Sequence, residues 1–459
     1  MKQLIVLGLI LIGFRLPGQE QLSLSQAIEI GLERNFDILI ERKNTLIAST
    51  NNTWGQAGRL PTVNLTVSSQ NSVRNQQTDN QFFGGQLFPG FQLDNQKTHS
   101  LNPGVSVGWT IFQGNRAIIN KNRLDQIQAE SEQNAEVVVS NTIQAIILGY
   151  YLAALEGRRL EEFRKQLDLS GDKYLYIKTK YDLGGAVTSD VLLEENNYLT
   201  DSANAINQQL SLNNALRNLN FLIVEPNLDK IYSLTDSLLV EEIVYDLDDL
   251  VDAAFNENVN LKRIYLTQAI LETTTSQQKS FLYPSLSLNG GFTWNRNVSD
   301  LTNAQYDGPT EDYQTPPKPL VNRTGTYFAN FTLAFTLFDG KRINNAIKNA
   351  IVQEDIGNLR IDQLKRSVSA DLATAYDQYR VRRQLYGINQ RRRVAAEINL
   401  NNTEQQYRNG SINSFDYRDV QNNYLSAAIQ ELQSIYNLID SKVTMMWLTG
   451  GIIETYTNE

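Results

Sequence analysis

Most of the chain carries hydrophobic residues at helical spacing. In the segment 143–155 the apolar side chains recur three and four positions apart, which places them on one face of a helix. They are Ile143, Ile146, Ile147, Tyr150, Tyr151, Ala154 and Leu155. No proline interrupts residues 115–181, so they can form one helix of about 100 Å at ~1.5 Å per residue. Gly184-Gly185 ends it, and a second helix is predicted to run back to Val224. Narrow apolar stripes on helices this long are typical of coiled-coil hairpins.

Four shorter segments alternate apolar with small polar residues instead. A period of two predicts strands with one apolar and one polar face. The predicted strands span residues 62–74, 98–113, 285–296 and 325–338. Between them lie the polar stretches 75–97 and 297–323, which we expect to be exposed loops.

The same order of elements occurs twice along the chain. Tyr181-x-x-Gly184 is matched by Tyr407-x-x-Gly410, and segment 109–116 by segment 335–342, each at an offset of 226 (407 − 181 and 335 − 109). Matches at a constant offset predict an internal two-fold repeat. The expected organisation is a signal peptide over 1–18, a first repeat over 19–224 with its hairpin tip near 184, an inter-repeat segment over 225–245 (equatorial by the family resemblance described below), a second repeat over 246–447 with its tip near 410, and a C-terminal tail over 448–459.

The first residues have the pattern of a secretory signal. Lys2 precedes an apolar run over residues 4–14, and Pro17-Gly18 follows it. A positive start, a short apolar centre and a small residue near the exit are typical of a cleaved signal peptide. The alternative is a short buried helix.

Four strands of this kind imply an assembly. Their length is close to the roughly 9–11 residues that a tilted transmembrane strand needs. A sheet in lipid must close, because every backbone polar group there needs a partner, and single-chain barrels have at least ~8 strands. Several copies would therefore share one barrel, with 8 strands from two chains or 12 from three. A soluble β-sandwich with helical arms is the alternative, but the Ser, Thr, Asn and Gly residues of the second face fit a wet lumen better.

Composition narrows the classes of function. The 21 Tyr, 17 Phe and 4 Trp are too much aromatic surface for a disordered chain. A net charge of −9 disfavours nucleic acid as a partner. With no Cys, one His (His99), no phosphate-cradling Gly loop and no metal-spaced cluster, we expect no enzyme activity and no cofactor or metal. The arginines between Arg380 and Arg393 form a basic cluster that is either a solvated face or a docking surface.

Taken together, these motifs resemble the TolC-like outer-membrane efflux protein family over nearly the whole mature chain. The carriers are Leu24-Ser25-Gln26-Ala27-Ile28 with Asn35 and their echo at 250–254 with Asn258, the strand-to-helix corners 109–116 and 335–342, and the tips Tyr181-x-x-Gly184 with Asp190 and Tyr407-x-x-Gly410 with Asp416. The resemblance implies a mixed α and β membrane protein. It would be a homotrimer with a 12-stranded β-barrel, four strands per chain, in the outer membrane of a Gram-negative bacterium, continued by a long periplasmic α-helical coiled-coil barrel.

The function implied is a passive duct of a tripartite efflux or type I secretion system. An inner-membrane pump and a periplasmic adaptor (membrane fusion) protein would load the substrate, and outer-membrane lipid would surround the barrel. The cargo, the pump class and the resting state stay open. The alternative function is a secreted structural or adhesive coiled-coil protein without a pore.

The resemblance also implies a periplasmic aperture lined by Asp416 and Asp419. Their spacing of three places both carboxylates on one helix face. A ring of such carboxylates would select cations and gate the narrow end. The alternative for Asp416 is a role at the helix start, with Ser414 as the cap.

A closed-state latch is implied at Asp190 and Tyr407. The alternative for Asp190 is again the helix start, next to Thr188 as cap. A basic latch residue is missing, because Ile412 stands where the family pattern places one.

The two hairpin tips are the expected contacts for the adaptor. The residues are Leu183, Gly184, Val187, Asn409, Gly410 and Ser414. The alternative is that the glycines serve only as helix C-caps.

Overall fold

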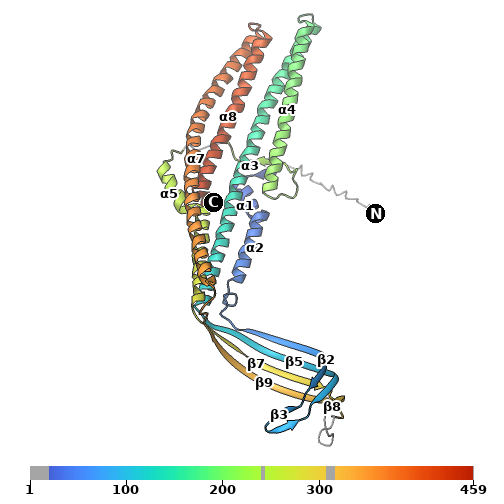
Figure 1. The fold of residues 1–459 in the computed structure, drawn as a ribbon. Helices are drawn as coiled ribbons and strands as arrows, with labels where there is room; N and C mark the ends of the chain where they lie inside the picture. Colours follow the sequence, from blue (N-terminus) through green and yellow to red (C-terminus); the bar gives the residue numbers. More distant parts are fainter. Residues whose placement is uncertain (1–19, 239–242, 307–315, 458–459) are drawn as a thin grey trace, which may run out of the picture. The chain divides into compact units, whose positions relative to one another are not determined.

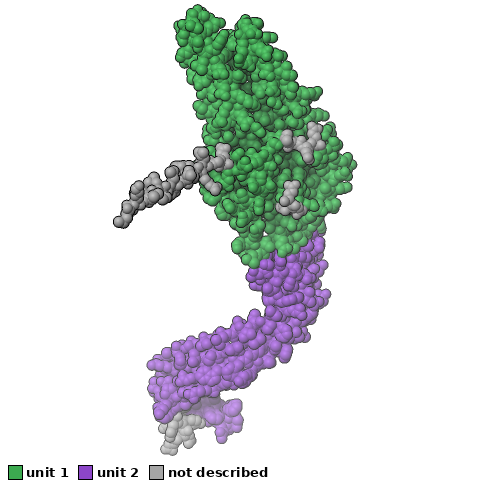
Figure 2. All heavy atoms as spheres, turned by 180° about the vertical axis from the view of Figure 1, so that it is seen from behind, with its two compact units in different colours: residues 1–47, 129–266, 358–459 green, residues 48–128, 267–357 purple. Residues whose placement is uncertain are grey.

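The computed structural model describes residues 20–238, 243–306 and 316–457 (Figure 1). The predicted signal peptide, residues 1–18, lies outside the described residues. The chain forms two compact units, drawn in different colours in Figure 2. Unit 1 comprises residues 1–47, 129–266 and 358–459, and unit 2 comprises residues 48–128 and 267–357.

Helices make up most of the described chain. They are α1 (Leu24–Arg34), α2 (Phe36–Asn51), α3 (Arg116–Asp182), α4 (Thr188–Leu222), α5 (Leu247–Glu257), α6 (Val259–Lys279), α7 (Arg342–Arg408), α8 (Ser414–Leu448) and α9 (Gly451–Thr457), with a 3-10 turn η1 (Ser280–Leu282). Helices α3 and α7 each have 67 residues, and α4 and α8 each have 35. Helix α3 begins 226 positions before α7 (342 − 116), and α4 begins 226 positions before α8 (414 − 188).

Two asparagines divide the shorter helices at equivalent places. The side chain of Asn35 accepts the Asp37 backbone N–H at 2.9 Å and so starts α2 where α1 ends. Asn258 does the same for α6, accepting from Asn260 at 3.0 Å. Its amide also donates to the Leu448 carbonyl at 2.7 Å, which ties α6 to the end of α8. Both asparagines are therefore structural caps.

The core of unit 1 lies around the apolar stripe of α3. Ile143, Ile146, Ile147 and Tyr150 are fully buried there, as the 3–4 spacing predicted. They pack against residues of α1, of α4 and its C-cap, and of α8, namely Ala27, Ile28, Leu219, Ile223, Ile439 and Val443. An 18-residue window of α3 has a mean hydropathy of 1.5, and half of it is buried inside the protein. The apolar character of that window follows from this core.

The segment between the two halves is fastened to unit 1. Strand β6 (Tyr232–Leu234) pairs in parallel with β1 (Glu20–Leu22). Behind it the Tyr150 hydroxyl donates to the Asp236 carboxylate at 2.7 Å and contacts the Leu22 carbonyl at 2.9 Å. Burial raises the pKa of Tyr150 well above its ordinary value, so the phenol stays protonated as a donor.

Unit 2 holds an antiparallel sheet in the order β2-β5-β7-β9. The strands are β2 (Thr62–Thr78), β5 (Phe91–Gln113), β7 (Ser285–Ser299) and β9 (Leu320–Ala334), with the short β8 (Ala304–Tyr306) beside β5 and a small hairpin of β3 (Gln81–Phe83) and β4 (Gln86–Phe88). The prediction of a loop over 75–97 is wrong for most of its length. Polar residues there continue the β2–β5 ladder as far as Thr78 and Phe91.

The last strand also differs from its predicted range of 325–338. Strand β9 begins earlier and ends at Ala334, which faces Ser285, the first residue of β7. Residues 335–338 have no neighbouring strand left to bond with, so the ladder stops although their alternation continues. Period two thus marks the side-chain pattern, whereas strand length depends on the partner.

The two faces of the sheet have opposite character. One row across the four long strands is Leu65, Val105, Phe292 and Tyr327, and the next row, on the other face, is Thr66, Gly104, Thr293 and Thr326. The apolar row is not covered, since Leu65 is 73% and Tyr327 83% exposed. Among the described residues no strand bonds to the outer edge of β2 or of β9.

Candidate functional site: the hairpin tips

Both helical hairpins turn through the same motif. In the first, Gly184 N–H donates to the Tyr181 carbonyl at 2.8 Å and Gly185 N–H to the Lys180 carbonyl at 2.7 Å. In the second, the same bonds run from Gly410 to Tyr407 and from Ser411 to Gln406. These are the two bonds of a Schellman turn, which requires a left-handed residue. Gly184 (φ 79°) and Gly410 (φ 74°) supply it.

The turns expose the residues expected to contact an adaptor. Leu183 is 83% and Val187 60% exposed, and both are hydrophobic. Asn409 and Gly410 are exposed as well, whereas Ser414 is half-buried. The glycine caps account for the turn but not for exposed apolar side chains at its end.

The caps of the returning helices differ from those predicted. Val187 precedes α4, and its backbone N–H reaches the Asp190 carboxylate at 3.5 Å, while the Thr188 hydroxyl donates to Tyr181 Oη at 3.4 Å. Asn413, and not Ser414, caps α8 by accepting the Asp416 N–H at 2.9 Å. The predictions of Thr188 and Ser414 as caps are therefore wrong. A backbone N–H needs an acceptor one residue outside the helix, and those two residues are already its first helical positions.

Asp416 and Asp419 both lie exposed on the first two turns of α8. The Asn413 amide donates to Asp416 Oδ2 at 2.9 Å, and the Asn423 amide donates to Asp419 Oδ2 at 3.1 Å. Within the described chain neither carboxylate has a basic side chain within ion-pair distance. The helix start accounts for the place of Asp416, whereas Asp419 leaves a negative charge on the same face without a cationic partner.

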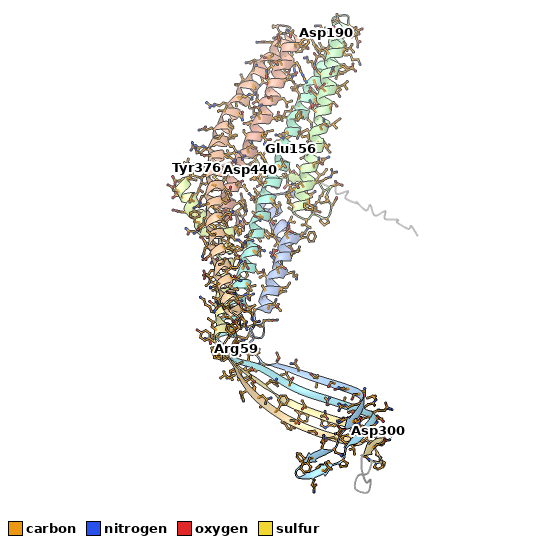
Figure 3. The ribbon with its side chains drawn as sticks, in the orientation of Figure 1. Arg59, Glu156, Asp190, Asp300, Tyr376 and Asp440 are labelled. Atoms are coloured by element: carbon orange, nitrogen blue, oxygen red, sulfur yellow. The ribbon has the colours of Figure 1, made fainter. Side chains whose placement is uncertain are left out.

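Asp190 and Tyr407 do not hydrogen-bond to each other within the described chain. Asp190 lies at the start of α4, at the tip of its hairpin (Figure 3). The Tyr407 ring stacks on Tyr417, with centroids 4.8 Å apart and planes 16° from parallel. Lys173 Nζ lies over both rings, 5.2 and 5.4 Å from their centroids. Tyr407 therefore packs between the helices of one chain through its ring.

A buried ion pair within the first hairpin lies just behind these residues, and it hydrogen-bonds to the second hairpin through Ser414. Lys173 Nζ on α3 lies 3.1 Å from Glu194 Oε1 on α4, and the two side chains are only 3% and 2% exposed. The same ammonium donates to the Ser414 carbonyl at 3.0 Å, and the Ser414 hydroxyl donates to Glu194. Burial lowers the pKa of Lys173, and the carboxylate of Glu194 opposes that shift. Sequence reasoning missed this group because Lys173 and Glu194 lie on different helices and Ser414 is 241 positions from Lys173 (414 − 173).

A second charged contact lies one step farther along the helices. The Arg418 guanidinium on α8 donates twice to the Asp201 carboxylate on α4, at 2.6 and 2.7 Å. Asp201 is 3% exposed and also accepts from Gln166 of α3 at 3.4 Å. Forked pairing of this kind fixes geometry as well as charge. The segment that carries Asp416 and Asp419 is thus held to the first hairpin by two buried contacts.

The basic cluster of α7 is used mainly within the chain. Arg382 pairs with Asp440 of α8 at 2.6 Å, and Arg393 pairs with Glu431 of α8 at 3.3 Å. Figure 3 labels Asp440. Arg380 lies near Asp377 of its own helix at 3.7 Å. The pairs of Arg382 and Arg393 bind α7 to α8. In the described ranges no group of three or more His, Cys, Asp or Glu is placed to hold a metal ion.

Comparison with known proteins identifies solved structures that share this fold. Solved structures with the same fold include crystal structures of CusC, which describe conformational changes that accompany folding and transmembrane channel formation. The TM-score is 0.72 at 13% sequence identity, and the alignment covers 93% of this chain and 92% of that chain. The solved structures also include the outer membrane channel CmeC of Campylobacter jejuni (0.71, 14%, 93% and 85%) and the open state of the outer membrane channel MtrE of Neisseria gonorrhoeae (0.68, 14%, 94% and 89%). At such identities the likeness establishes the fold, which is that of outer-membrane channels.

One protein-family model also matches part of the sequence. The model described as outer membrane efflux protein matches residues 250–451, the part of the chain that contains α7, the second tip and α8. Residues 250–451 are therefore similar to the outer membrane efflux proteins, in agreement with the resemblance drawn from the repeated motifs. A comparison with curated sequences gave no significant match.

Proposed function

We propose that the protein is the outer-membrane duct of a tripartite efflux or type I secretion system in a Gram-negative bacterium. The strands of unit 2 would cross the outer membrane, and the long helices would extend into the periplasm. Substrate would arrive from an inner-membrane pump through a periplasmic adaptor and leave passively. The molecule would do no catalysis in this role.

One observation carries the proposal: an uncovered apolar sheet face with two open edges. The row of Leu65, Val105, Phe292 and Tyr327 is apolar, and its members are exposed except for the half-buried Phe292, while the opposite row is small and polar. Lipid is the environment that suits the first row, and a water-filled lumen suits the second. The edges of β2 and β9 would pair between neighbouring copies, because unpaired backbone groups are costly in lipid.

We assign three copies to the barrel. Four long strands per chain give 12 in a trimer (3 × 4), and the resemblance to the efflux family favours that number over 8. The four long helices of each chain would form the helical barrel. In this arrangement residues 19–224 and 246–447 act as two copies of one plan, and residues 225–245 form the equatorial segment between them. The equal lengths of α3 and α7 and of α4 and α8 support the duplication.

Asp416 and Asp419 would form the periplasmic aperture. Both are exposed and lack a cationic partner among the described residues. Three chains would bring six carboxylates around one axis (3 × 2), which concentrates negative potential at the narrow end.

Asp190 and Tyr407 would contribute to the closed state through contacts between chains. The exposed residues Leu183 and Val187, with Gly184, Asn409, Gly410 and Ser414 at the turns, would meet the adaptor. The rival function, a secreted structural or adhesive stalk without a pore, leaves the exposed apolar sheet face without a role.

The proposal is tested by purifying the protein from membranes in detergent, measuring its mass by light scattering and recording currents in planar bilayers. We expect a trimer that conducts cations in preference to anions. A water-soluble monomer without channel activity would refute the duct.

Cross-linking tests the closure of the barrel directly. The chain has no cysteine, so Thr66→Cys on β2 can be combined with one cysteine at a time along β9. Alternate β9 positions should form disulfides between chains, because side chains on one face recur every second residue. Complete oxidation should stop at covalent trimers. A ladder that stops at dimers, or no linked product at any position, would contradict the 12-stranded barrel.

A further inference from the structure

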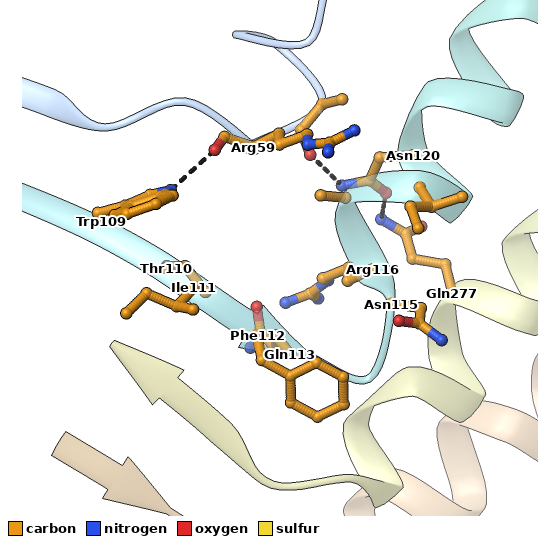
Figure 4. A pocket seen from close by; sticks show the side chains of 14 residues that line it. Arg59, Trp109, Thr110, Ile111, Phe112, Gln113, Asn115, Arg116, Asn120 and Gln277 are labelled. Atoms are coloured by element: carbon orange, nitrogen blue, oxygen red, sulfur yellow. Dashed lines mark hydrogen bonds between the residues drawn. The ribbon is translucent and has the colours of Figure 1, made fainter. Parts of the chain in front are cut away.

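A cavity of about 550 Å³ lies in unit 2, where β5 turns into α3 (Figure 4). It is bounded by the loop before β2, the end of β5 and the first turn of α3. The residues used below are Arg59, Trp109, Gln113, Arg116, Asn120 and Gln277. Among the described residues that line it, none is acidic. None of the expected site residues lies here.

Two guanidinium groups face this cavity without an anionic partner. In the described part of the chain neither Arg59 nor Arg116 forms an ion pair. Each lies instead on an aromatic ring: Arg59 is 4.6 Å from the Trp54 centroid, and Arg116 is 3.8 Å from that of Phe281. Stacking holds a guanidinium plane and leaves its N–H donors in the plane available. Partial burial lowers the pKa of Arg116, and no carboxylate opposes the shift.

Hydrogen bonds build the wall of the cavity. Trp109 Nε1 donates to the Arg59 carbonyl at 2.9 Å, and Asn120 donates to the Ala57 carbonyl at 3.3 Å. Gln277 of α6 in turn donates to Asn120 Oδ1 at 2.8 Å. These bonds fix the loop that carries Arg59 against α3 and α6, so the two arginines are held on one cavity.

The equivalent strand-to-helix corner of the second half, before α7, contains a carboxylate side chain, that of Asp339. Asp339 Oδ2 accepts the Ile343 N–H at the start of α7 at 2.7 Å, and Arg342 donates to the Asp339 carbonyl at 3.2 Å. Gln113 stands at the matching position of the first half (339 − 113 = 226). The first corner therefore keeps the arginine and the helix start but lacks the carboxylate, which leaves positive charge for an external anion.

An exposed apolar strip leads away from the cavity along the sheet. Trp109 and Ile111 are 39% and 41% exposed at the end of β5, and Val105 continues the strip up the same strand. On β2 the neighbouring Val63 and Leu65 are also exposed and face Val107 and Val105. Acyl chains match such a strip, whereas a free phosphate ion has no use for it. Tryptophan is also enriched at the level of lipid headgroups.

We propose that this corner cavity binds the phosphate of a phospholipid headgroup from the inner leaflet of the outer membrane. Arg59 and Arg116 hold the phosphate oxygens, and the acyl chains lie along Trp109, Ile111 and Val105. The inference rests on the proposed function, because that function places the corner at the periplasmic surface of the membrane. The lipid would anchor the loop before β2 to the start of α3 at each protomer.

The test is native mass spectrometry of the full-length protein in detergent, titrated with palmitoyl-oleoyl phosphatidylglycerol. We expect one bound lipid per protomer, and about tenfold weaker binding in the Arg59→Gln/Arg116→Gln variant, which loses charge-assisted bonds to phosphate. Arg342→Gln removes a matched arginine at the second corner and should bind as the wild type does. Diacylglycerol with the same chains, which lacks the phosphate, should not bind.

Equal binding by the double variant, or by diacylglycerol, would overturn the proposal. Retention of inorganic phosphate at this corner without any lipid adduct would assign the cavity to the free ion instead. If the double variant fails to fold, the wild-type protein serves: phosphatidylglycerol with a photoreactive headgroup should label residues 57–59 or 113–118, and labelling only elsewhere refutes the site. Mass and bilayer currents of the same sample report separately on the channel itself.

Discussion

At the scale of single residues, the buried ion pair of Lys173 and Glu194 should contribute to the stability of the hairpin tips, because neither side chain can be solvated if its partner is lost. Lys173→Met would leave the Glu194 carboxylate buried without its ammonium partner. Breaking a buried pair in this way costs about 3–5 kcal/mol. We expect the amides of α4 near Glu194 to exchange hydrogen much faster in this variant, measured by hydrogen–deuterium exchange with mass spectrometry.

The matched control is Lys165→Met, eight positions before Lys173 on the same helix (173 − 165). Lys165 pairs with Glu162 at 2.8 Å, but its side chain is 59% exposed, so its loss should cost only about 0–1 kcal/mol. The double change Lys173→Met/Glu194→Met should recover part of the loss, because it leaves no lone buried charge. Equal exchange in Lys173→Met and Lys165→Met would show that the pair does not hold the tip.

At the scale of elements, two glycines of α7 and its turn should respond in opposite directions. Gly410→Ala forces a side chain into a left-handed residue (φ 74°) and should destabilise the hairpin by about 1–2 kcal/mol. Gly387→Ala lies inside the helix, where an added methyl meets open space, and should stabilise it by about 0.5–1 kcal/mol. Thermal unfolding followed by circular dichroism compares the two, and a shift of the same sign in both would contradict the turn geometry.

The elements also show what the sequence could predict. The apolar stripe at Ile143 and Ile146, and the glycines at the turns, are local signals, and the long helices follow from them. Beyond residue 74 the strands carry no alternation of apolar and polar residues, because polar residues such as Gln76 and Gln77 pair through their backbones with Leu93 and Gln92. Strand ends therefore depended on partners that only the fold supplies.

The candidate site likewise has features that follow from the local sequence and contacts that depend on the fold. A spacing of three predicts that Asp416 and Asp419 share a helix face, and both are exposed residues of α8, whereas their role in an aperture stays a prediction. The contacts behind them were not, since Arg418 and its partner Asp201 are 217 positions apart (418 − 201) and each alone resembles a surface charge. The predicted helix caps were wrong by one residue. Asn413 and Val187 precede α8 and α4, whereas Ser414 and Thr188 are the first residues of these helices.

At the scale of the whole molecule, the aperture exists only if the copies assemble. In one chain Asp416 and Asp419 are two exposed carboxylates with amide partners, and nothing there gates a path. In a trimer each of their charges would be repeated around the axis, and removing them should change ion flow without changing assembly. The Asp416→Asn/Asp419→Asn variant should therefore lose cation preference and block by divalent cations, measured as reversal potential and conductance in planar bilayers.

The control for that measurement is Asp377→Asn, an exposed carboxylate on α7 about 45 Å from the tip along the helix. Its removal makes the net charge of the chain less negative by one but leaves the proposed ring intact, so ion selectivity should stay near that of the wild type. If both variants changed selectivity equally, the effect would come from overall charge and not from a ring at the tip. Unchanged selectivity and block in Asp416→Asn/Asp419→Asn, with the trimer intact, would remove these residues from the aperture. The duct itself would then need its narrow point elsewhere along the helices.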